Sequence, residues 1–576
     1  MLRQRLMCAA LAFCVCVSGS VAAVAADVSR VIPDNALGFA VINRVGETQG
    51  KIAKLADSLQ LPEKIKAATT RMNVAALKGL DKDGSIAVAA IVDSETPGAP
   101  VAVWFVPTTD YQAAIQQLQP EDANAKIAKV TMGNNACVVG KKGAYAVLTA
   151  AGDASVLEQV LDSTDSVAAS TKRLRRWAAR KDAYAVATPG GIKMAQQAIL
   201  AGLAMGKAKI AEQGGEQAEM TLRGIELYEE LFKAVDGEVA YCAIGVQINE
   251  DGDVHILGRS LLAPDGTLAK LSKTAGEAPA DSLAGLPQGP FVFAGGGPYP
   301  ASWAKELTGF YVNMMKMYMG MGAIPEDQAK KFAELTEESM KGLRSMGLMM
   351  GTVEPGESLY SNMIATIDTD DAQKYMATYG RVVGEMGEIF KKADNPLMTF
   401  EAEDIEIDGI KALKMSMDMS FMFGEQEMPP EAKKMIETMI GAGGKLDMYA
   451  AAADDNTVII TYVSKERLIQ TLKAVREGRP QFSEEPNVAK TAGMLLPGAQ
   501  WTGFWSPEGT LKLAAAVVAT VAPDAPIDIP EFPSPAPIGF AVKMSPGVVD
   551  TDMVIPADIL NAIPEFVKAI KAMDKN

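Results

Sequence analysis

Short runs in which apolar and polar residues alternate are separated by longer stretches with helical periodicity. "INEDGDVHILGRSLLAPDGTLAKL" (248–271) has the pattern of a strand, an acidic turn at Asp251-Gly252, a second strand and the start of a helix. "VKMSPGVVDTDMVIPADILNAI" (542–563) repeats this order, with Pro546-Gly547 in the turn. Period-2 strands joined by tight turns favour antiparallel pairing. Each stretch therefore predicts a β-hairpin followed by a helix.

Further pairs of similar stretches occur in the same order in the two halves of the chain. The pairs are 37–55 with 290–307, 101–118 with 359–376, 144–161 with 457–475, and 183–200 with 500–518. They predict an α+β fold made of duplicated two-layer units, each an antiparallel sheet with helices on one face. We expect the first copy over 27–285 and the second over 286–576. The proline-rich stretch 522–539 predicts an extended connection before the final hairpin.

The first 26 residues have the pattern of a secretory signal peptide. Arg3 and Arg5 form a basic region, an apolar run follows, and Ala23-Val24-Ala25 is a small-residue cleavage site. The mature chain is expected to start near Asp27. No later segment approaches the roughly 18 apolar residues that a membrane helix needs, so we expect an exported protein, periplasmic or extracellular, without a membrane span.

The charge balance of the chain is acidic. Its 55 Lys and Arg face 71 Asp and Glu, for a net charge of −16, and removal of Arg3 and Arg5 makes the mature chain more acidic still. A protein this negative repels nucleic acid at long range, so a nucleic-acid partner is not expected. One basic stretch, "TKRLRRWAARK" (171–181), departs from this balance. It is typical either of a solvated helix face with Leu174 and Trp177 turned inward or of a contact with an anionic polymer or lipid headgroup surface.

Few residues are available for cysteine, histidine or zinc chemistry. Cys137 and Cys242 are the cysteines that remain after the signal, each within an apolar strand-like run. Export permits a disulfide between them, and buried free cysteines are the alternative. His255 is the only histidine, and these three residues have no recognised zinc spacing. We expect no metal, no cofactor and no histidine-based triad.

Other catalytic and binding patterns are incomplete. Ser302-Trp303-Ala304-Lys305 matches the S-x-x-K pattern of serine acylases, but Lys490-Thr491-Ala492-Gly493 has one residue too many for the strand motif that should accompany it. A serine at a helix start explains Ser302 equally. "DKDGSI" (81–86) lacks the flanking oxygen ligands of a calcium loop and predicts a turn into a strand. "FAGGGPYP" (293–300) lacks the lysine and the spacing of a phosphate-binding loop.

Most of the 32 methionines lie between Met314 and Met448. Met314, Met317 and Met321 are spaced as the buried stripe of a helix. Met415, Met417 and Met419 alternate with polar residues, as in a half-buried strand. Three interpretations remain open for these six residues: packing in a core, an apolar groove for a ligand or partner, and Cu(I) binding through thioethers.

The stretches "VIPDNALGFAVINRVGE" (31–47), "LPQGPFVFAGG" (286–296), "LKGLDKDGSIAVAAIV" (77–92) and "PTTDYQAAI" (107–115) resemble an uncharacterised class of exported bacterial proteins. In that class a strand after a proline opens the domain, and a Thr-x-Asp begins a helix after a strand. The resemblance implies export and a duplicated α+β fold. It brings no catalytic or binding residues.

These observations favour an exported, non-enzymatic protein that binds an apolar ligand or a protein partner, or that serves as an envelope component. The alternative is a hydrolase that acts through carboxylates, which have no fixed sequence spacing, or through Ser302 and Lys305. A purely structural role is a third reading.

Overall fold

The computed structural model describes residues 27–63, 78–93, 98–132, 135–212, 214, 216–234, 236–276, 282–303, 326–392, 400–418, 440, 445–479, 481–522 and 529–573. The fold is α+β, as predicted, with 37% helix and 32% strand. The 19 strands found among the described residues pair antiparallel. The described residues fall into two compact units.

Unit 1 takes its described residues from Met1–Ala204, Val235–Gly266 and Val548–Asp550. Its strands lie in the order β4-β5-β6-β3-β2-β1-β7-β8-β9. Its elements are η1 (Val28–Arg30), β1 (Gly38–Ile42), α2 (Val45–Ser58), β2 (Ile86–Ile91), β3 (Val101–Pro107), α4 (Tyr111–Gln116), β4 (Ile127–Met132), β5 (Asn135–Lys142), β6 (Tyr145–Ala150), η3 (Ala151–Asp153), α5 (Ala154–Asp162), α6 (Arg175–Ala178), β7 (Ala183–Ala187), most of α7 (Pro189–Ala211), β8 (Val239–Ile248) and β9 (Val254–Leu262).

Unit 2 comprises the described residues of Met205–Ala234, Thr267–Gly547 and Thr551–Asn576. Its strands lie in the order β13-β14-β15-β16-β12-β11-β10-β17-β18. Its elements are α8 (Glu216–Ala234), α9 (Thr267–Ser272), β10 (Phe291–Pro298), η4 (Ala301–Trp303), α11 (Glu326–Ser339), β11 (Leu343–Gly351), β12 (Met363–Thr369), α12 (Ala372–Lys392), β13 (Phe400–Ile407), β14 (Ile410–Asp418), β15 (Lys445–Ala452), β16 (Thr457–Tyr462), α14 (Lys465–Arg476), η8 (Phe482–Glu484), α15 (Pro486–Ala492), β17 (Trp501–Trp505), α16 (Pro507–Val521), β18 (Ile538–Ser545), the larger part of β19 (Val548–Ile555) and α17 (Ala557–Met573).

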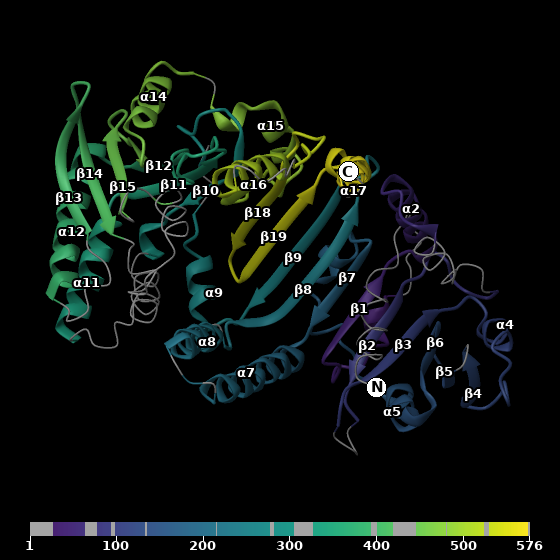
Figure 1. Cartoon of the computed structure of the whole chain (residues 1–576). Coiled ribbons are helices and arrows are strands. Elements are labelled where there is room, and N and C mark those ends of the chain that lie inside the picture. Colours follow the sequence, from purple (N-terminus) through teal and green to yellow (C-terminus); the bar gives the residue numbers. More distant parts are fainter. Residues whose placement is uncertain are drawn as a thin grey trace. The chain divides into compact units, whose positions relative to one another are not determined.

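The two strand orders match, with β13 as an additional edge strand of unit 2. The order β5-β6-β3-β2-β1-β7-β8 of unit 1 corresponds to β15-β16-β12-β11-β10-β17-β18 of unit 2. Figure 1 labels these strands except β16 and β17. In both units the strand that opens the sequence lies in the middle, between the strand that follows it and one that comes from much later in the chain. The pairs of stretches that share a sequence pattern therefore fall on corresponding elements.

Local contacts also match at the start of the helix after β7 and after β17. The Thr188 hydroxyl accepts a hydrogen bond from the Gly191 N–H at 3.4 Å, and the Ser506 hydroxyl accepts one from the Gly509 N–H at 2.9 Å. A side chain at either glycine would overlap a backbone carbonyl, that of Leu37 or Phe291. Glycine is needed because the helix begins directly against the central strand of its unit.

A second matched contact joins two glycines in the left-handed conformation to a strand-to-helix connection. Gly79 has φ +77° and Gly342 has φ +81°. The Gly79 carbonyl accepts a hydrogen bond from the Asp110 N–H, and the Gly342 carbonyl accepts one from the Asp370 N–H. Both glycines stand in a Lys-Gly-Leu sequence, because an L side chain is disfavoured at this φ.

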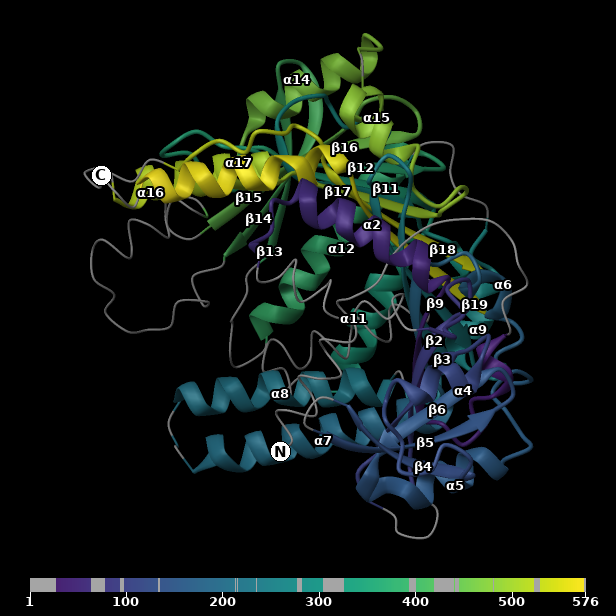
Figure 2. The ribbon, with the colours of Figure 1, turned by 90° about the vertical axis from the view of Figure 1, so that its right-hand side faces the viewer.

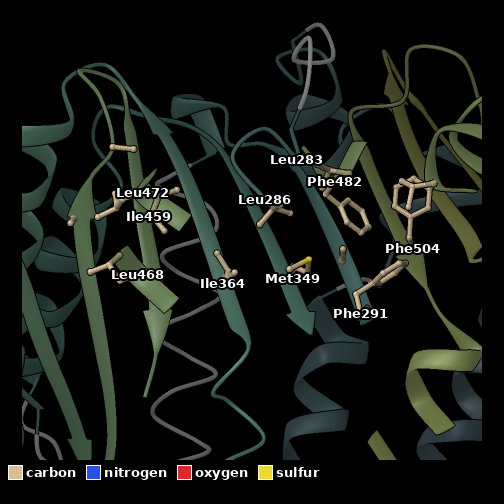
Figure 3. Packing of buried hydrophobic residues seen from close by; sticks show 14 of the residues in the cluster. Leu283, Leu286, Phe291, Met349, Ile364, Ile459, Leu468, Leu472, Phe482 and Phe504 are labelled. Atoms are coloured by element: carbon tan, nitrogen blue, oxygen red, sulfur yellow. The ribbon is translucent and has the colours of Figure 1, made fainter. Parts of the chain in front are cut away.

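Helices cover both faces of each sheet, which corrects the prediction of helices on one face. In unit 2, Ile459 of β16 packs in a core with Leu468 and Leu472 of α14, shown in Figure 3. Its neighbour Ile460 packs in a second core with Tyr375 of α12. Successive residues of a strand point to opposite faces, so α14 and α12 lie on opposite sides of β16. Ion pairs from Lys331 and Arg381 hold α11 beside α12 (Figure 2).

The same arrangement occurs in unit 1. Val139 of β5 and Leu148 of β6 pack in a core with Ile115 of α4. On the other face, Gly140 of β5 makes room for Leu161 of α5. The physical reason is visible in β6, where five consecutive residues are buried. Such continuous apolar runs mark strands that are covered on both sides, whereas we expected alternation.

Three further predictions concern the turn at 81–86, the proline-rich stretch and the signal peptide. Residues 81–86 form a turn into β2, as predicted, with the Asp83 N–H bonded to the Asp81 carboxylate at 3.1 Å. Residues 529–537 of the proline-rich stretch form neither helix nor strand and lead directly into β18. The predicted signal peptide lies outside the described residues.

Candidate functional site

The methionines predicted as core or groove residues are only partly described. Met415 of β14 is 1% exposed and packs against the α12 side of the sheet. Met417, two residues further on the same strand, is half-buried. Met415 therefore belongs to the core. Met314, Met317, Met321 and Met419 lie outside the described residues.

The serine of the S-x-x-K pattern is exposed on η4, and Lys305 lies outside the described residues. The stretch Tyr360-Ser361-Asn362 precedes β12 and forms a turn. The Ser361 hydroxyl donates to the Ser358 carbonyl at 2.7 Å, and the Asn362 amide donates to the Thr352 carbonyl at 2.6 Å. These contacts give Ser361 and Asn362 a role in the backbone of the turn.

Cys137 and Cys242 are both free, so the disulfide that export permits is not formed. Cys137 is half-buried on β5, and Cys242 is exposed on β8. The strands β6, β3, β2, β1 and β7 lie between them. At about 4.8 Å per strand this separation far exceeds the Cα distance of a disulfide, which is below about 7 Å.

Among the residues that the structure describes, no group of three or more His, Cys, Asp or Glu side chains is placed to hold a metal ion. His255 lies on β9 opposite Gln247 of β8. It is half-buried, and on the neighbouring strand Cys242 is paired with Ser260, five residues further along β9.

A polar cluster on the α14 side of unit 2 was not predicted. The Asp447 carboxylate on β15 accepts hydrogen bonds from Ser416 at 2.6 Å and from Tyr449 at 3.3 Å. Lys414 of β14 lies 3.1 Å from the same carboxylate, and the Lys465 ammonium lies 5.4 Å from the centroid of the Tyr449 ring. Lysine, serine and aspartate thus meet at one point of the sheet.

The electrostatics of this cluster do not suit acid–base catalysis. Burial alone would raise the pKa of Asp447, but hydrogen bonds from Ser416 and Lys414 lower it below its usual value. Burial, together with the Asp447 charge, raises the pKa of Tyr449 to about 12. A carboxylate with a lowered pKa is a weak general base, and a phenol with a raised pKa is a weak acid. The cluster therefore stabilises the strand pair β14–β15.

Aromatic side chains gather on one face of unit 2, at β10 and β17. A register shift between Phe291 and Phe293 turns Phe291 and Ala294 to the core and Phe293 to the opposite face. On β17, Phe504 lies in the core. Alternation along the strand therefore places Trp501 and Trp505 on the same face as Phe293. Phe293 and Trp505 are paired directly across the two strands.

Glycines make room for these rings. The edge of the Phe293 ring would lie 3.6 Å from a methyl group at Gly503 and 3.1 Å from one at Gly295. Trp501 occupies the space that a side chain at Gly297 would need. Trp501 also stacks on Trp303, with ring centroids 5.1 Å apart. The glycine run that lacked the lysine and the spacing of a phosphate-binding loop is thus the place where aromatic rings lie directly against the backbone.

Large apolar side chains on this face remain exposed. Phe293 is 41% exposed, Trp505 is 39% exposed, and Met346 on the neighbouring strand β11 is 48% exposed. Met346 is paired with Gly297, so it lies on the same face. We call Phe293, Met346, Trp501 and Trp505 the aromatic platform. Arg344, also on β11, lies two residues from Met346 and forms an ion pair with Asp368 at 3.0 Å.

Sequence reasoning missed the aromatic platform. The signal was present in "WTGFW" (501–505), where two tryptophans alternate around a glycine, and in "FVFAGGG" (291–297). Recognising it required knowing that these two strands pair, although they are 200 residues apart, and that a register shift turns Phe293 outward.

One hollow among the described residues is lined by residues before β12 and on α16: Val353, Glu354, Glu357, Leu359, Ala516, Val517, Thr520 and Val521. Its volume is about 10 Å³, which holds at most one water molecule. Ligand pockets usually have volumes of roughly 300–1,000 Å³. This hollow is too small for an organic ligand.

Within the described ranges, no helix combines the length and the apolar character needed to cross a membrane. Comparison with known proteins adds no assignment: no family model, no curated protein and no solved structure matches the chain.

Proposed function

We propose that the chain is an exported, non-enzymatic binding protein whose aromatic platform docks a protein partner of the bacterial envelope. The observation that carries the proposal is the exposure of Phe293, Met346 and Trp505 on one face of adjacent strands. Tryptophan, phenylalanine and methionine are enriched at the centres of protein interfaces and depleted elsewhere on protein surfaces. Arg344 at the side of the platform adds a residue type that is common among interface hot spots.

The form of the platform favours a protein over a small apolar ligand. A small ligand is normally held in a concave site that buries most of its surface. The platform residues are exposed side by side on three neighbouring strands, β11, β10 and β17. Such a row of exposed side chains is better matched by another protein surface.

The hydrolase alternative has less support. The Asp447 cluster contains a carboxylate, a serine and a lysine, but the lowered pKa of Asp447 makes it a poor base. Ser302 is exposed on η4, and Lys305 lies outside the described residues, so the sequence pattern alone supports the serine mechanism.

We also infer that the chain arose by internal duplication. The matched strand orders, the Thr-Pro-Gly-Gly and Ser-Pro-Glu-Gly helix starts and the two Lys-Gly-Leu turns support this. The predicted signal peptide, and not the fold, is the basis for export. The resemblance to exported bacterial proteins of unknown function also supports export.

Photo-crosslinking tests the proposed function. A benzophenone amino acid is placed at position 346 in one version of the protein and at Met132 in another, and the producing cells are irradiated. Met132 is a matched control because it is 46% exposed but lies on β4, in unit 1. We expect a discrete protein adduct from position 346 and none from position 132. Equal labelling at both positions, or none at either, would contradict the proposal.

A second measurement distinguishes a protein partner from a small apolar ligand at the platform. Lipid extraction of the purified protein, followed by mass spectrometry, detects an apolar molecule that co-purifies. If one is found at stoichiometric amounts and is lost in Trp505→Ala, the platform binds a small ligand and the partner proposal is wrong.

A further inference from the structure

The basic stretch 171–181 forms an ordered cationic surface in unit 1. It contains six Lys and Arg and no Asp or Glu, in a chain of net charge −16. Helical backbone bonds run through it, from Thr171 N–H to Val167 C=O and from Lys181 N–H to Ala178 C=O. Leu174 is 1% exposed and Trp177 is 8% exposed, so both point inward. Leu174 and Trp177 are thus turned inward, as predicted, although only Arg175–Ala178 (α6) is helix and the flanking residues form turns.

The other face of this segment carries five exposed cations: Lys172, Arg173, Arg175, Arg176 and Arg180. We call these five residues the cationic surface. The sixth cation, Lys181, is buried, with its ammonium 5.4 Å from the centroid of the Trp177 ring. Since Leu174 and Trp177 fix the backbone, the five cations are held on a rigid support.

Neighbouring side chains reinforce the positive charge. Arg44 donates to the Ala179 carbonyl at 3.2 Å. Of the adjacent carboxylates, Asp182 is 1% exposed and is engaged by Lys51 and Arg44. Asp27 lies 3.1 Å from Arg175 and is 23% exposed. The Asp182 and Asp27 side chains are thus largely covered, whereas Lys172, Arg176 and Arg180 are exposed. Asp27, at which the mature chain is predicted to start, is held at the cationic surface by its ion pair with Arg175.

We propose that the cationic surface binds the phosphate headgroups of an anionic membrane. Arginine presents a planar fork of donors that matches phosphate oxygens, and four of the five residues are arginine. Each Lys or Arg near an anionic bilayer strengthens binding roughly fivefold, and the attraction is confined to about a Debye length. This inference shares the predicted export with the proposed function but does not depend on the aromatic platform.

Vesicle co-sedimentation of the full-length exported protein tests the inference. The vesicles contain phosphatidylcholine alone or phosphatidylcholine with phosphatidylglycerol, at low salt and at roughly 0.5 M salt. The test variant is Lys172→Gln/Arg176→Gln/Arg180→Gln. The control is Lys78→Gln/Lys129→Gln/Lys193→Gln, which removes the same charge from exposed positions elsewhere in unit 1. Circular dichroism verifies that both variants are folded.

We expect binding only to the vesicles with phosphatidylglycerol, with loss at high salt. The test variant should bind on the order of 100-fold more weakly than the parent, and the control should bind like the parent. Equal weakening of the two variants, or unchanged binding of the test variant, would overturn the inference. Tighter binding to a soluble anionic glycan such as heparin than to the vesicles would also overturn it and assign the surface to a polymer. Neither result would affect the crosslink expected from position 346.

Discussion

Unit 1 and unit 2 place different side chains at matched positions of the same sheet face. At the end of β7, Ala187 is paired with Gly38 of β1. At the end of β17, Trp505 is paired with Phe293 of β10. Ala187 and Trp505 each directly precede the Thr or Ser that starts the next helix. A shared backbone therefore carries small residues in one unit and an exposed aromatic pair in the other.

A second difference lies in the core, at the residue before β7 and before β17. The Asp182 carboxylate accepts a hydrogen bond from the Ile248 N–H at 2.8 Å, and the Gln500 amide oxygen accepts one from the Met544 N–H at 2.8 Å. Both residues are almost fully buried. Asp182 is balanced by Lys51 and Arg44, whereas the Gln500 amide donates to the carbonyls of Met544 and Gly276. We call the hydrogen bond from a backbone N–H to the Asp182 or Gln500 side chain the clamp. The clamp is the same in both units, but the groups that contact its side chain are charged in unit 1 and neutral in unit 2.

These differences show that the two units share a backbone frame, which is the strand order together with the hydrogen bonds at the clamps and helix starts, and not the side chains placed on it. The frame tolerates a charged or a neutral residue at the clamp, provided that every polar atom has a partner. It also tolerates glycine or phenylalanine at the exposed positions that carry Phe293 and Trp505 in unit 2, which we call the open face, because these positions do not need to be filled for the core to pack. Variation on the open face is therefore free to serve binding.

The clamp should give the largest effect on stability. We expect Asp182→Ala to lower the free energy of unfolding by about 3–5 kcal/mol, because it leaves Lys51 and Arg44 beside a buried site without their anion. Gln500→Ala removes neutral hydrogen bonds and should cost about 1–3 kcal/mol. Urea unfolding measures both, with the exposed Asp165→Ala as control. A larger cost at Gln500 than at Asp182 would break the comparison of the two clamps.

The helix-start glycines should give the next largest effect, and it should be similar in the two units. Gly191→Ala and Gly509→Ala each force a methyl group against a backbone carbonyl, and we expect each to cost about 1–3 kcal/mol. Gly202→Ala is the matched control, since nothing lies within 4 Å of its added methyl group and the helix gains about 0.5–1 kcal/mol. If one of the two test glycines tolerates alanine, the two helix starts are not equivalent.

Converting the open face of unit 2 to that of unit 1 should affect binding more than folding. In Phe293→Gly/Trp505→Ala, we expect the crosslink from position 346 to disappear, because aromatic hot spots contribute about 2 kcal/mol or more each. The stability cost should be about 2 kcal/mol or less, since both side chains are substantially exposed. Phe504→Ala, on the core face of the same strand, should instead cost about 3–5 kcal/mol. A crosslink that survives the double variant would show that the platform is not the docking surface.

The smallest effect concerns the acid dependence of unit 2. The lowered pKa of Asp447 means that its carboxylate stabilises the fold above the unfolded value of about 3.9 and that this contribution is lost as the pH falls through the lower folded value. Asp447→Asn should therefore cost about 1 kcal/mol at pH 7 and less near pH 3.

Denaturant unfolding at the two pH values measures the Asp447 effect, with the exposed Glu403→Gln as control. A cost that is equal at both pH values would show that the carboxylate charge contributes nothing to the cluster.

The sequence pattern identified more of the architecture than of the site. The sequence pattern paired the stretches 183–200 and 500–518, and the structure gives Thr188 with Gly191, and Ser506 with Gly509, the same contact within them. The site was missed because Phe293, Met346 and Trp505 come from three strands that are distant in sequence. No local period indicates which strands become neighbours.

The chain by itself determined the α+β class, the order of its elements and the turns at Gly252 and Gly547, which both have a positive φ, because these depend on local periodicity and on the φ angles that a residue permits. Only the tertiary structure decided which faces of the strands are covered. Ile459 and Ile460 are both apolar, yet they pack against different helices. Phe291 and Phe293 are identical side chains, yet one is 7% exposed and the other 41%. Burial depends on what lies on each side of a strand, and that is set by pairing between distant segments.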